Sequence, residues 1–144
     1  SFVRCGVLGE NGDGVDVSGS SIRIKSLNFD NIADKALSIG ENSVVEGDDI
    51  HIKNARIAIA SKDLSYVKIR NIKVSNSKVG FAVFQKKPEY GYSNLEMINL
   101  KADDVDEPYL VEIGSTLAIE GEKVIPNSSH VRDLLYGSKS KTVN

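Results

Sequence analysis

Several residue types that mark large classes of protein are scarce or missing. The 144 residues include no tryptophan, one cysteine, three prolines and four phenylalanines. The lone Cys5 excludes an internal disulfide framework and a zinc site built on cysteines. The longest apolar runs are only a few residues, too short for a helix that crosses a bilayer, so we expect no membrane insertion.

An excess of one charge is lacking as well. The 18 Lys and Arg residues oppose 20 Asp and Glu residues, and the formal net charge is −2 with the two signs interleaved. A clustered basic excess is the usual mark of a protein that binds nucleic acid, so we expect no nucleic-acid partner. The hydrophobic share of 40% and the charged share of 26% are ordinary for a folded chain of single-domain length.

The abundant residues favour strands and turns. The sequence has 15 Val and 14 Ile against 10 Leu, together with 17 Ser, 12 Gly and 11 Asn. Side chains branched at Cβ favour strands, whereas Gly, Asn and Ser favour turns. We therefore predict a mostly β protein with many short strands.

A sequence repeat runs through the first part of the chain. Apolar residues alternate at Val15 and Val17, and the alternation returns 22 residues later at Leu37 and Ile39. Two further short alternating runs separate successive copies, so each period holds three short strands. Such a period predicts a solenoid. The related segments begin at Gly14, Lys35, Arg56 and Lys78.

Stacking of coils explains why such a repeat is stable. One coil cannot bury its inward apolar rows alone, whereas stacked coils pair each strand in parallel with the next and close a continuous core. A sandwich built from hairpins is the alternative, but residues 11–14 are the only candidate for a two-residue Asn-Gly or Asp-Gly turn, and no clean alternation precedes them. We predict an all-β parallel β-helix with three short strands per coil, in which Leu37 stacks on Val15.

The pattern fades after the fourth repeat. Residues 85–93 are expected to form a loop that bulges from a turn, and residues 117–124 a hairpin. A short helix is predicted over residues 130–136, where it would serve as a lid on the last coil. We divide the chain into a β-helix domain, 1–127, and a C-terminal capping helix with a polar tail, 128–144.

The N-terminal end leads to a different expectation. Val3, Val7 and Leu8 resemble part of a coil, and no obvious cap precedes them. Either further coils come before this segment or a second copy of the chain covers it. We therefore expect the C-terminal part of a larger protein, with other domains of that protein as partners, or a homo-oligomer formed through the uncapped N-terminal coil.

Residues 11–40 resemble the right-handed parallel β-helix families of the pectin lyase-like superfamily, and most closely the polygalacturonase branch. That family opens one coil with Asn-Thr-Asp-Gly and carries an Asp-Asp pair one coil later, followed by Gly-His-Gly and then Arg-x-Lys. The stretch Asn-Gly-Asp-Gly at 11–14 and the coil spacing carry the resemblance, which extends over roughly residues 11–84. It implies a parallel β-helix fold.

The resemblance also implies positions for catalytic residues. Asp13 matches the first catalytic carboxylate, and Asp34 the first member of the Asp-Asp pair. Lys35 stands where the second member would be, and Arg56 falls near the histidine of the family. Inverting hydrolysis needs one protonated carboxyl and one base, and two cations beside Asp34 favour its ionised form. We expect no catalytic residues; if the protein is an enzyme, these four form the site.

The same residues allow two interpretations as a surface. Asp13, Asp34, Lys35, Arg56 and Lys78 recur at one-coil spacing and should stack on one edge. They form either a polar groove for an anionic or hydroxylated sugar, or a solvated ladder of mixed charge.

Metal binding is expected only under a lyase interpretation. Polysaccharide lyases of this fold hold Ca²⁺ with clustered carboxylates, and Asp48 and Asp49 are the candidates here. Calcium takes six to eight oxygen ligands, whereas few carboxylates lie nearby in the sequence. We therefore expect no cofactor and interpret the pair as a solvated acidic turn unless the protein is a lyase.

The loop after the fourth repeat is the predicted ligand-binding surface. Tyrosine rings offer sugars a flat stacking face, and binding residues often lie on loops held by a rigid scaffold. The candidates are Lys86, Lys87, Glu89, Tyr90 and Tyr92.

Three functions are compatible with the sequence. We expect a non-catalytic module, carbohydrate-binding or structural, in a bacterial cell-surface or secreted protein, because residues 34–43 and 56–65 resemble repeats of such proteins. This places it outside the cell or in the cell envelope, with a polysaccharide as partner. The alternatives are a polysaccharide lyase or glycoside hydrolase acting on acidic polysaccharide, and an assembly module that stacks end to end.

Overall fold

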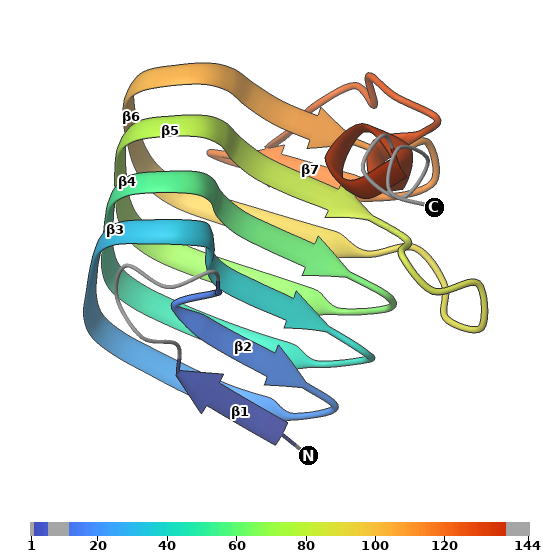
Figure 1. Cartoon of the computed structure of the whole chain (residues 1–144), viewed down its shortest axis with the longest axis horizontal. Coiled ribbons are helices and arrows are strands. Elements are labelled where there is room, and N and C mark those ends of the chain that lie inside the picture. Colours follow the sequence, from blue (N-terminus) through green and yellow to red (C-terminus); the bar gives the residue numbers. More distant parts are fainter. Residues whose placement is uncertain (1, 6–11, 138–144) are drawn as a thin grey trace.

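The chain forms a stack of parallel coils. The computed structural model describes residues 2–5 and 12–137 and is a parallel β-solenoid of about 5 turns, with about 22 residues per coil (Figure 1). The predicted all-β parallel β-helix is therefore confirmed. The elements are β1 (Phe2–Cys5), β2 (Val15–Ser18), β3 (Ser21–Gly40), β4 (Val44–Lys62), β5 (Tyr66–Phe84), β6 (Asn94–Val111), β7 (Thr116–Ile119), β8 (Glu122–Lys123) and the helical turn η1 (Asp133–Gly137).

The repeat in the sequence becomes aliphatic ladders inside the coils. Leu37 pairs with Val15 on one side, as predicted, and with Ile59 on the other, and Phe81 continues the row. Leu37 and Ile59 are fully buried, and Phe81 is 1% exposed. Because parallel strands lie about 4.8 Å apart, each row is a continuous line of apolar contacts that buries what a single coil would expose.

Residues with positive φ bend each long strand into three straight segments. In β4, φ is 61° at Asp49 and 57° at Asn54. Asn31, Asn54 and Asn76 occupy the same corner of successive coils, and Nδ2 of Asn76 donates to Oδ1 of Asn54 at 2.6 Å. Asn adopts the left-handed conformation more readily than most residues. The three short strands predicted for each coil are therefore parts of one bent strand.

The two ends of the stack differ from its middle. β1 runs antiparallel to β2, with Val3 opposite Val17. Val3 therefore does not belong to a parallel coil, which corrects the expectation from the sequence; Val7 and Leu8 lie outside the described residues. At the other end β7 and β8 form the predicted antiparallel hairpin. The polar tail, 138–144, also lies outside the described residues.

The outer edge of β6 is protected by charge. Within the described part of the chain, no strand pairs with this edge beyond Met97. Residues 103–107 of this segment include four carboxylates, and Pro108 follows them. Repulsion between like charges and the missing N–H of proline both oppose the addition of another strand.

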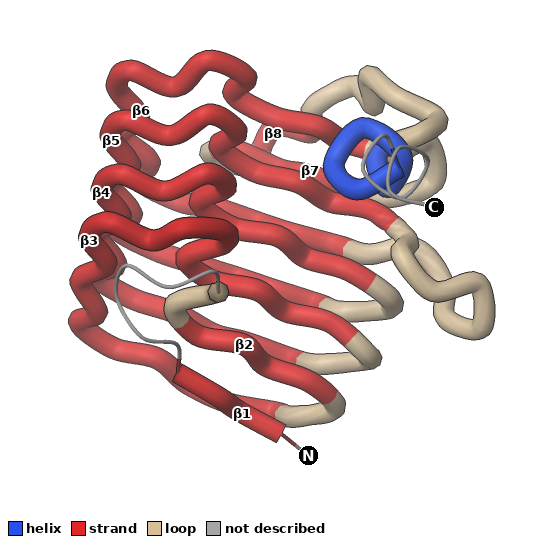
Figure 2. The backbone as a smooth tube through the Cα atoms, viewed as in Figure 1, coloured by secondary structure: helices blue, strands red, loops and turns tan. Residues whose placement is uncertain are grey.

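One outer surface of the coils positions the candidate sites. Val131 and Leu135, just before and within η1, pack on it against Ile57, Ala82 and Leu110 of three successive coils. The predicted helix thus lies beside the later coils of the stack rather than over its end (Figure 2). No residue of β2 or β3 belongs to this cluster. We call this surface the third wall; it consists of the outward side chains of residues 35–40, 57–62, 79–84 and 107–112.

Candidate functional site

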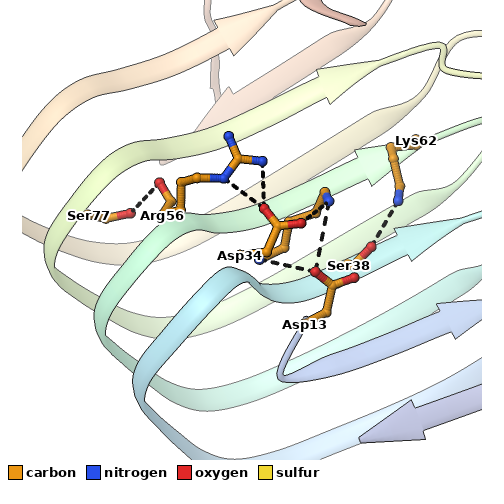
Figure 3. A network of polar contacts seen from close by, with 7 residues as sticks. Asp13, Asp34, Ser38, Arg56, Lys62 and Ser77 are labelled. Carbon is orange, nitrogen blue, oxygen red and sulfur yellow. Dashed lines mark hydrogen bonds and ion pairs between the residues drawn. The ribbon is translucent and has the colours of Figure 1, made fainter. Parts of the chain in front are cut away.

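The four residues suggested by the family resemblance come together at the start of the third wall (Figure 3). Oδ2 of Asp34 lies 2.9 Å from Nζ of Lys35, and its Oδ1 lies 2.6 Å from Nη2 of Arg56. Oδ1 of Asp13 accepts the backbone N–H of Lys35 at 3.1 Å and lies 3.8 Å from its Nζ. Parallel stacking brings these residues together because they are about one coil apart in the sequence.

The charges in this network hold Asp34 ionised. Burial acts to raise the pKa of the Asp34 carboxyl, but the hydrogen bonds and charges of Lys35 and Arg56 outweigh it and keep the pKa below its ordinary value. Burial likewise acts to lower the pKa of Lys35. Contacts with Tyr136 and Asp34 and the charge of Asp13 outweigh it and raise that pKa. Asp34 is therefore a poor proton donor at neutral pH, as the sequence indicates.

The C-terminal segment covers one side of this ion network. The Lys35 ammonium lies 5.0 Å from the centroid of the Tyr136 ring, and the Lys35 side chain is 5% exposed. A cation above an aromatic face is attracted by the ring. Lys78 is exposed and lines a separate depression with Arg56 and Asp106. The predicted edge is thus a partly buried ion network across the first three coils rather than a continuous groove.

Asp48 and Asp49 do not form a shared site. Asp48 accepts a hydrogen bond from Nδ2 of Asn71 in the following coil at 2.9 Å. Asp49 accepts one from the hydroxyl of Ser26 in the preceding coil at 3.2 Å and lies 3.3 Å from Nε2 of His51. The positive φ of Asp49 accounts for this divergence. Across residues 2–5 and 12–137, no three His, Cys, Asp or Glu side chains form a group that could hold a metal ion.

The predicted binding loop is fixed by hydrogen bonds at both ends. Oδ1 of the buried Asp63 accepts the backbone N–H groups of Lys86 and Lys87 at 2.7 and 2.8 Å. Glu112 accepts the N–H of Gln85 at 3.0 Å. At the far end, the backbone N–H of residue 64 donates to the carbonyl of residue 91 at 3.1 Å. The loop therefore presents its side chains from a backbone that is held at both ends.

Two cavities flank this loop. The helix-side cavity, of about 480 Å³, lies between the loop and the segment that leads into η1, and Lys86 and Tyr92 line it. The coil-side cavity, of about 240 Å³, is lined by Lys86 and Lys87 together with residues of the lower coils. Glu89 and Tyr90 line neither cavity. The other residues around the helix-side cavity are Gln85, Pro88, Glu112, Ile113, Ser129, His130, Arg132 and Asp133.

Tyr92 is held as a platform at the rim of the helix-side cavity. A Cβ atom at Gly114 would lie only 2.7 Å from the Tyr92 ring, so only glycine allows the ring to lie against the backbone there. Gly114 also has a φ of 103°, a conformation that other residues rarely adopt. Tyr92 remains 47% exposed. One side of the ring is thus supported while much of the side chain is open to solvent.

A second buried lysine was not identified from the sequence. Lys62 on the third wall is 9% exposed, and its Nζ donates to the hydroxyl of Ser38 at 2.8 Å. Burial, with the charges of Lys35 and Lys86, lowers its pKa to about 8. One signal existed in the sequence, since Gly40 lies 22 residues earlier and leaves room for a long side chain from the next coil. A Cβ at Gly40 would lie 3.3 Å from Cε of Lys62.

The sequence also gave no reason to combine the loop with Arg132 and Asp133. These residues follow Tyr92 by about forty positions and belong to no repeat. They reach the loop because η1 docks on the third wall, a tertiary contact without periodicity.

No protein-family model, curated protein or solved structure matches this chain. The similarity to polygalacturonase-type repeats thus remains a resemblance in sequence pattern, while the solenoid itself is shown by the structure. In the part of the chain that the structure describes, no helix is long and apolar enough to cross a membrane.

Proposed function

We propose that this protein is a non-catalytic β-solenoid module that binds carbohydrate in the helix-side cavity. The observation that carries the proposal is the exposed Tyr92 ring, supported by Gly114 and placed at a cavity rich in hydrogen-bonding side chains. A sugar ring has an apolar C–H face and a rim of hydroxyls. An aromatic platform beside polar groups complements both features.

The cavity has a suitable size and chemistry for a saccharide. Its volume of about 480 Å³ falls in the range of ligand sites, roughly 300–1,000 Å³. Arg132 and His130 can donate hydrogen bonds to hydroxyl oxygens, and Asp133 can accept from hydroxyl groups. Charged side chains of both signs line the cavity, so the hydroxyl pattern of a neutral or weakly charged sugar suits it better than a polyanion.

The ion network supports a role without catalysis. Glycoside hydrolysis assigns different protonation states to two carboxyl groups, and Asp34 is held ionised between Lys35 and Arg56. Lys35 is itself covered by Tyr136. We therefore expect no reducing-sugar or unsaturated product from polygalacturonate or related glycans. Product formation by the wild type that disappears in Asp34→Ala would contradict this expectation.

Binding is tested with an immobilised glycan array followed by titration of the best ligand. Tyr92→Ala should weaken binding about tenfold, the effect of losing roughly 1.4 kcal/mol of stacking. Tyr66→Ala is the matched control, because Tyr66 is 48% exposed but lines neither of the two cavities beside the loop. Arg132→Ala should also weaken binding. Equal affinity of Tyr92→Ala and wild type, or equal loss in Tyr66→Ala, would contradict the proposed site.

A further inference from the structure

Lys62 is a buried amine without an acidic partner close by. Among the described residues, no carboxylate lies within 4.0 Å of its ammonium, and its hydrogen bond goes to the neutral hydroxyl of Ser38, which is itself 1% exposed. A buried ammonium that lacks a counter-ion is disfavoured relative to the neutral amine. The neutral amine carries the lone pair that a nucleophile needs.

Burial and the nearby charges together give Lys62 a larger neutral fraction than an ordinary lysine has. Lys35 and Lys86 repel a proton on Nζ, while Asp16 and Asp13 attract one only at longer range. Other charged groups that line the same cavity are already engaged: Glu41 pairs with Lys87, and Asp63 accepts two backbone N–H groups. Burial and the lysine charges together prevail and leave the pKa of Lys62 at about 8.

The Lys62 side chain also lines a cavity. Lys62 lines the coil-side cavity, of about 240 Å³, whose floor includes Gly40 and Ser18. A Cβ at Gly40 would lie 3.9 Å from Nζ, so a side chain there would narrow the approach to the amine. The remaining walls carry hydrogen-bonding groups from Glu41, Asp63 and Lys87. A small molecule with hydroxyl groups could therefore reach Nζ and be held by polar contacts.

We propose that Lys62 is a nucleophilic amine that captures small hydroxyaldehydes reversibly, as an imine, in the coil-side cavity. In this reaction Nζ attacks the carbonyl carbon and forms a carbinolamine. The carbonyl oxygen then leaves as water with the two hydrogens of the neutral amine, and a C=N bond remains. No oxidant, reductant or cofactor is consumed. The site is separate from the saccharide site at Tyr92, so either proposal can fail alone.

The experiment measures where an aldehyde reacts on the folded wild-type chain. Glycolaldehyde and cyanoborohydride are added briefly at pH 7, so that imines are trapped as stable secondary amines, and modified lysines are identified by peptide mass spectrometry. Lys62 should be labelled at least about tenfold faster than the exposed Lys53, because burial and the nearby lysine charges enlarge the neutral, nucleophilic fraction of Lys62. In urea the two rates should become equal.

A matched variant tests whether the missing counter-ion causes the reactivity. Ser38→Asp places a carboxylate where the neutral hydroxyl now meets Nζ, and it should lower labelling of Lys62 to the rate of Lys53. Ser38→Asn, which adds similar bulk without charge, should retain the fast labelling. The proposal is overturned if wild-type Lys62 reacts no faster than Lys53, a result that does not depend on the folding of any variant. Fast labelling that survives in Ser38→Asp would overturn it as well.

Discussion

Two lysines on the same wall of the solenoid are buried to nearly the same extent but are held in opposite ways. Lys35 is 4% exposed and Lys62 is 9% exposed. Lys35 lies beside the carboxylates of Asp34 and Asp13, and its pKa is raised. Lys62 meets a serine hydroxyl, and its pKa falls to about 8. The depth of burial is thus a poor guide to the state of a lysine, and the identity of its partner decides.

The difference assigns separate roles to the two residues. The Lys35 network joins the first three coils and is covered by Tyr136, so it stabilises the fold. Lys62 costs stability as an ammonium but lines a cavity, which is the usual combination at sites of function. Substitutions that remove either lysine, or that replace the hydroxyl partner of Lys62 by a carboxylate, test whether the two residues differ in this way.

The largest expected effect comes from removing each ammonium. Lys35→Met leaves Asp13 and Asp34 without their shared partner and should lower the free energy of unfolding at pH 7 by about 3 kcal/mol. Lys62→Met removes a buried charge that has no carboxylate partner and should raise it by about 1–2 kcal/mol. Urea denaturation followed by circular dichroism measures both. Equal losses in the two variants would remove the distinction between the lysines.

The next effect is a pH dependence specific to Lys62. Between pH of about 8 and 10.5 the unfolded chain keeps a proton on Lys62 that the folded chain has released, so raising the pH favours folding. The free energy of unfolding of the wild type, minus that of Lys62→Met, should increase across this window by somewhat under 3 kcal/mol, about 1.4 kcal/mol for each tenfold change in proton affinity. If this difference in the free energy of unfolding did not change with pH, the proton affinity of Lys62 would be the same in the folded and unfolded chain.

Lys35 should show the opposite sign. Because its folded pKa is raised, its contribution to stability is complete below the ordinary value of 10.5 and is lost as the pH rises through the folded value. Wild type and Lys62→Met both contain Lys35. Subtracting the free energy of unfolding of Lys62→Met from that of the wild type at each pH therefore cancels the contribution of Lys35.

The smallest expected effect comes from giving Lys62 a carboxylate partner like that of Lys35. Ser38→Asp should give Lys62 a partner like that of Lys35, and a double-mutant cycle with Lys62→Met should yield a coupling energy of about 1–2 kcal/mol. Ser38→Asn in the same cycle is the uncharged control and should give a coupling near zero. Similar coupling for Asp and Asn would mean that shape, and not charge, links positions 38 and 62.

Much of the fold could be predicted because a solenoid makes sequence spacing and spatial contact equivalent. Residues about 22 apart, such as Val15 and Leu37, become neighbours once the coils stack. The same rule brought Asp13, Asp34 and Arg56 together. It could not show that Asp48 and Asp49 diverge, because a positive φ at one residue turned its side chain toward the preceding coil.

The sequence by itself thus determined the coil, its aliphatic interior, the projecting loop and the charges available at each level of the stack. Only the tertiary structure decided which charges meet and which are covered. The pairing register shifts between Ile32 and Lys35, and η1 docks on the third wall from far along the chain. The shift lies where Arg56 of β4 meets Asp34 of β3, and the docked helix brings Tyr136 above Lys35 and Arg132 to the loop. Periodicity encodes contacts between repeats, whereas a bulge and a docked helix follow no period.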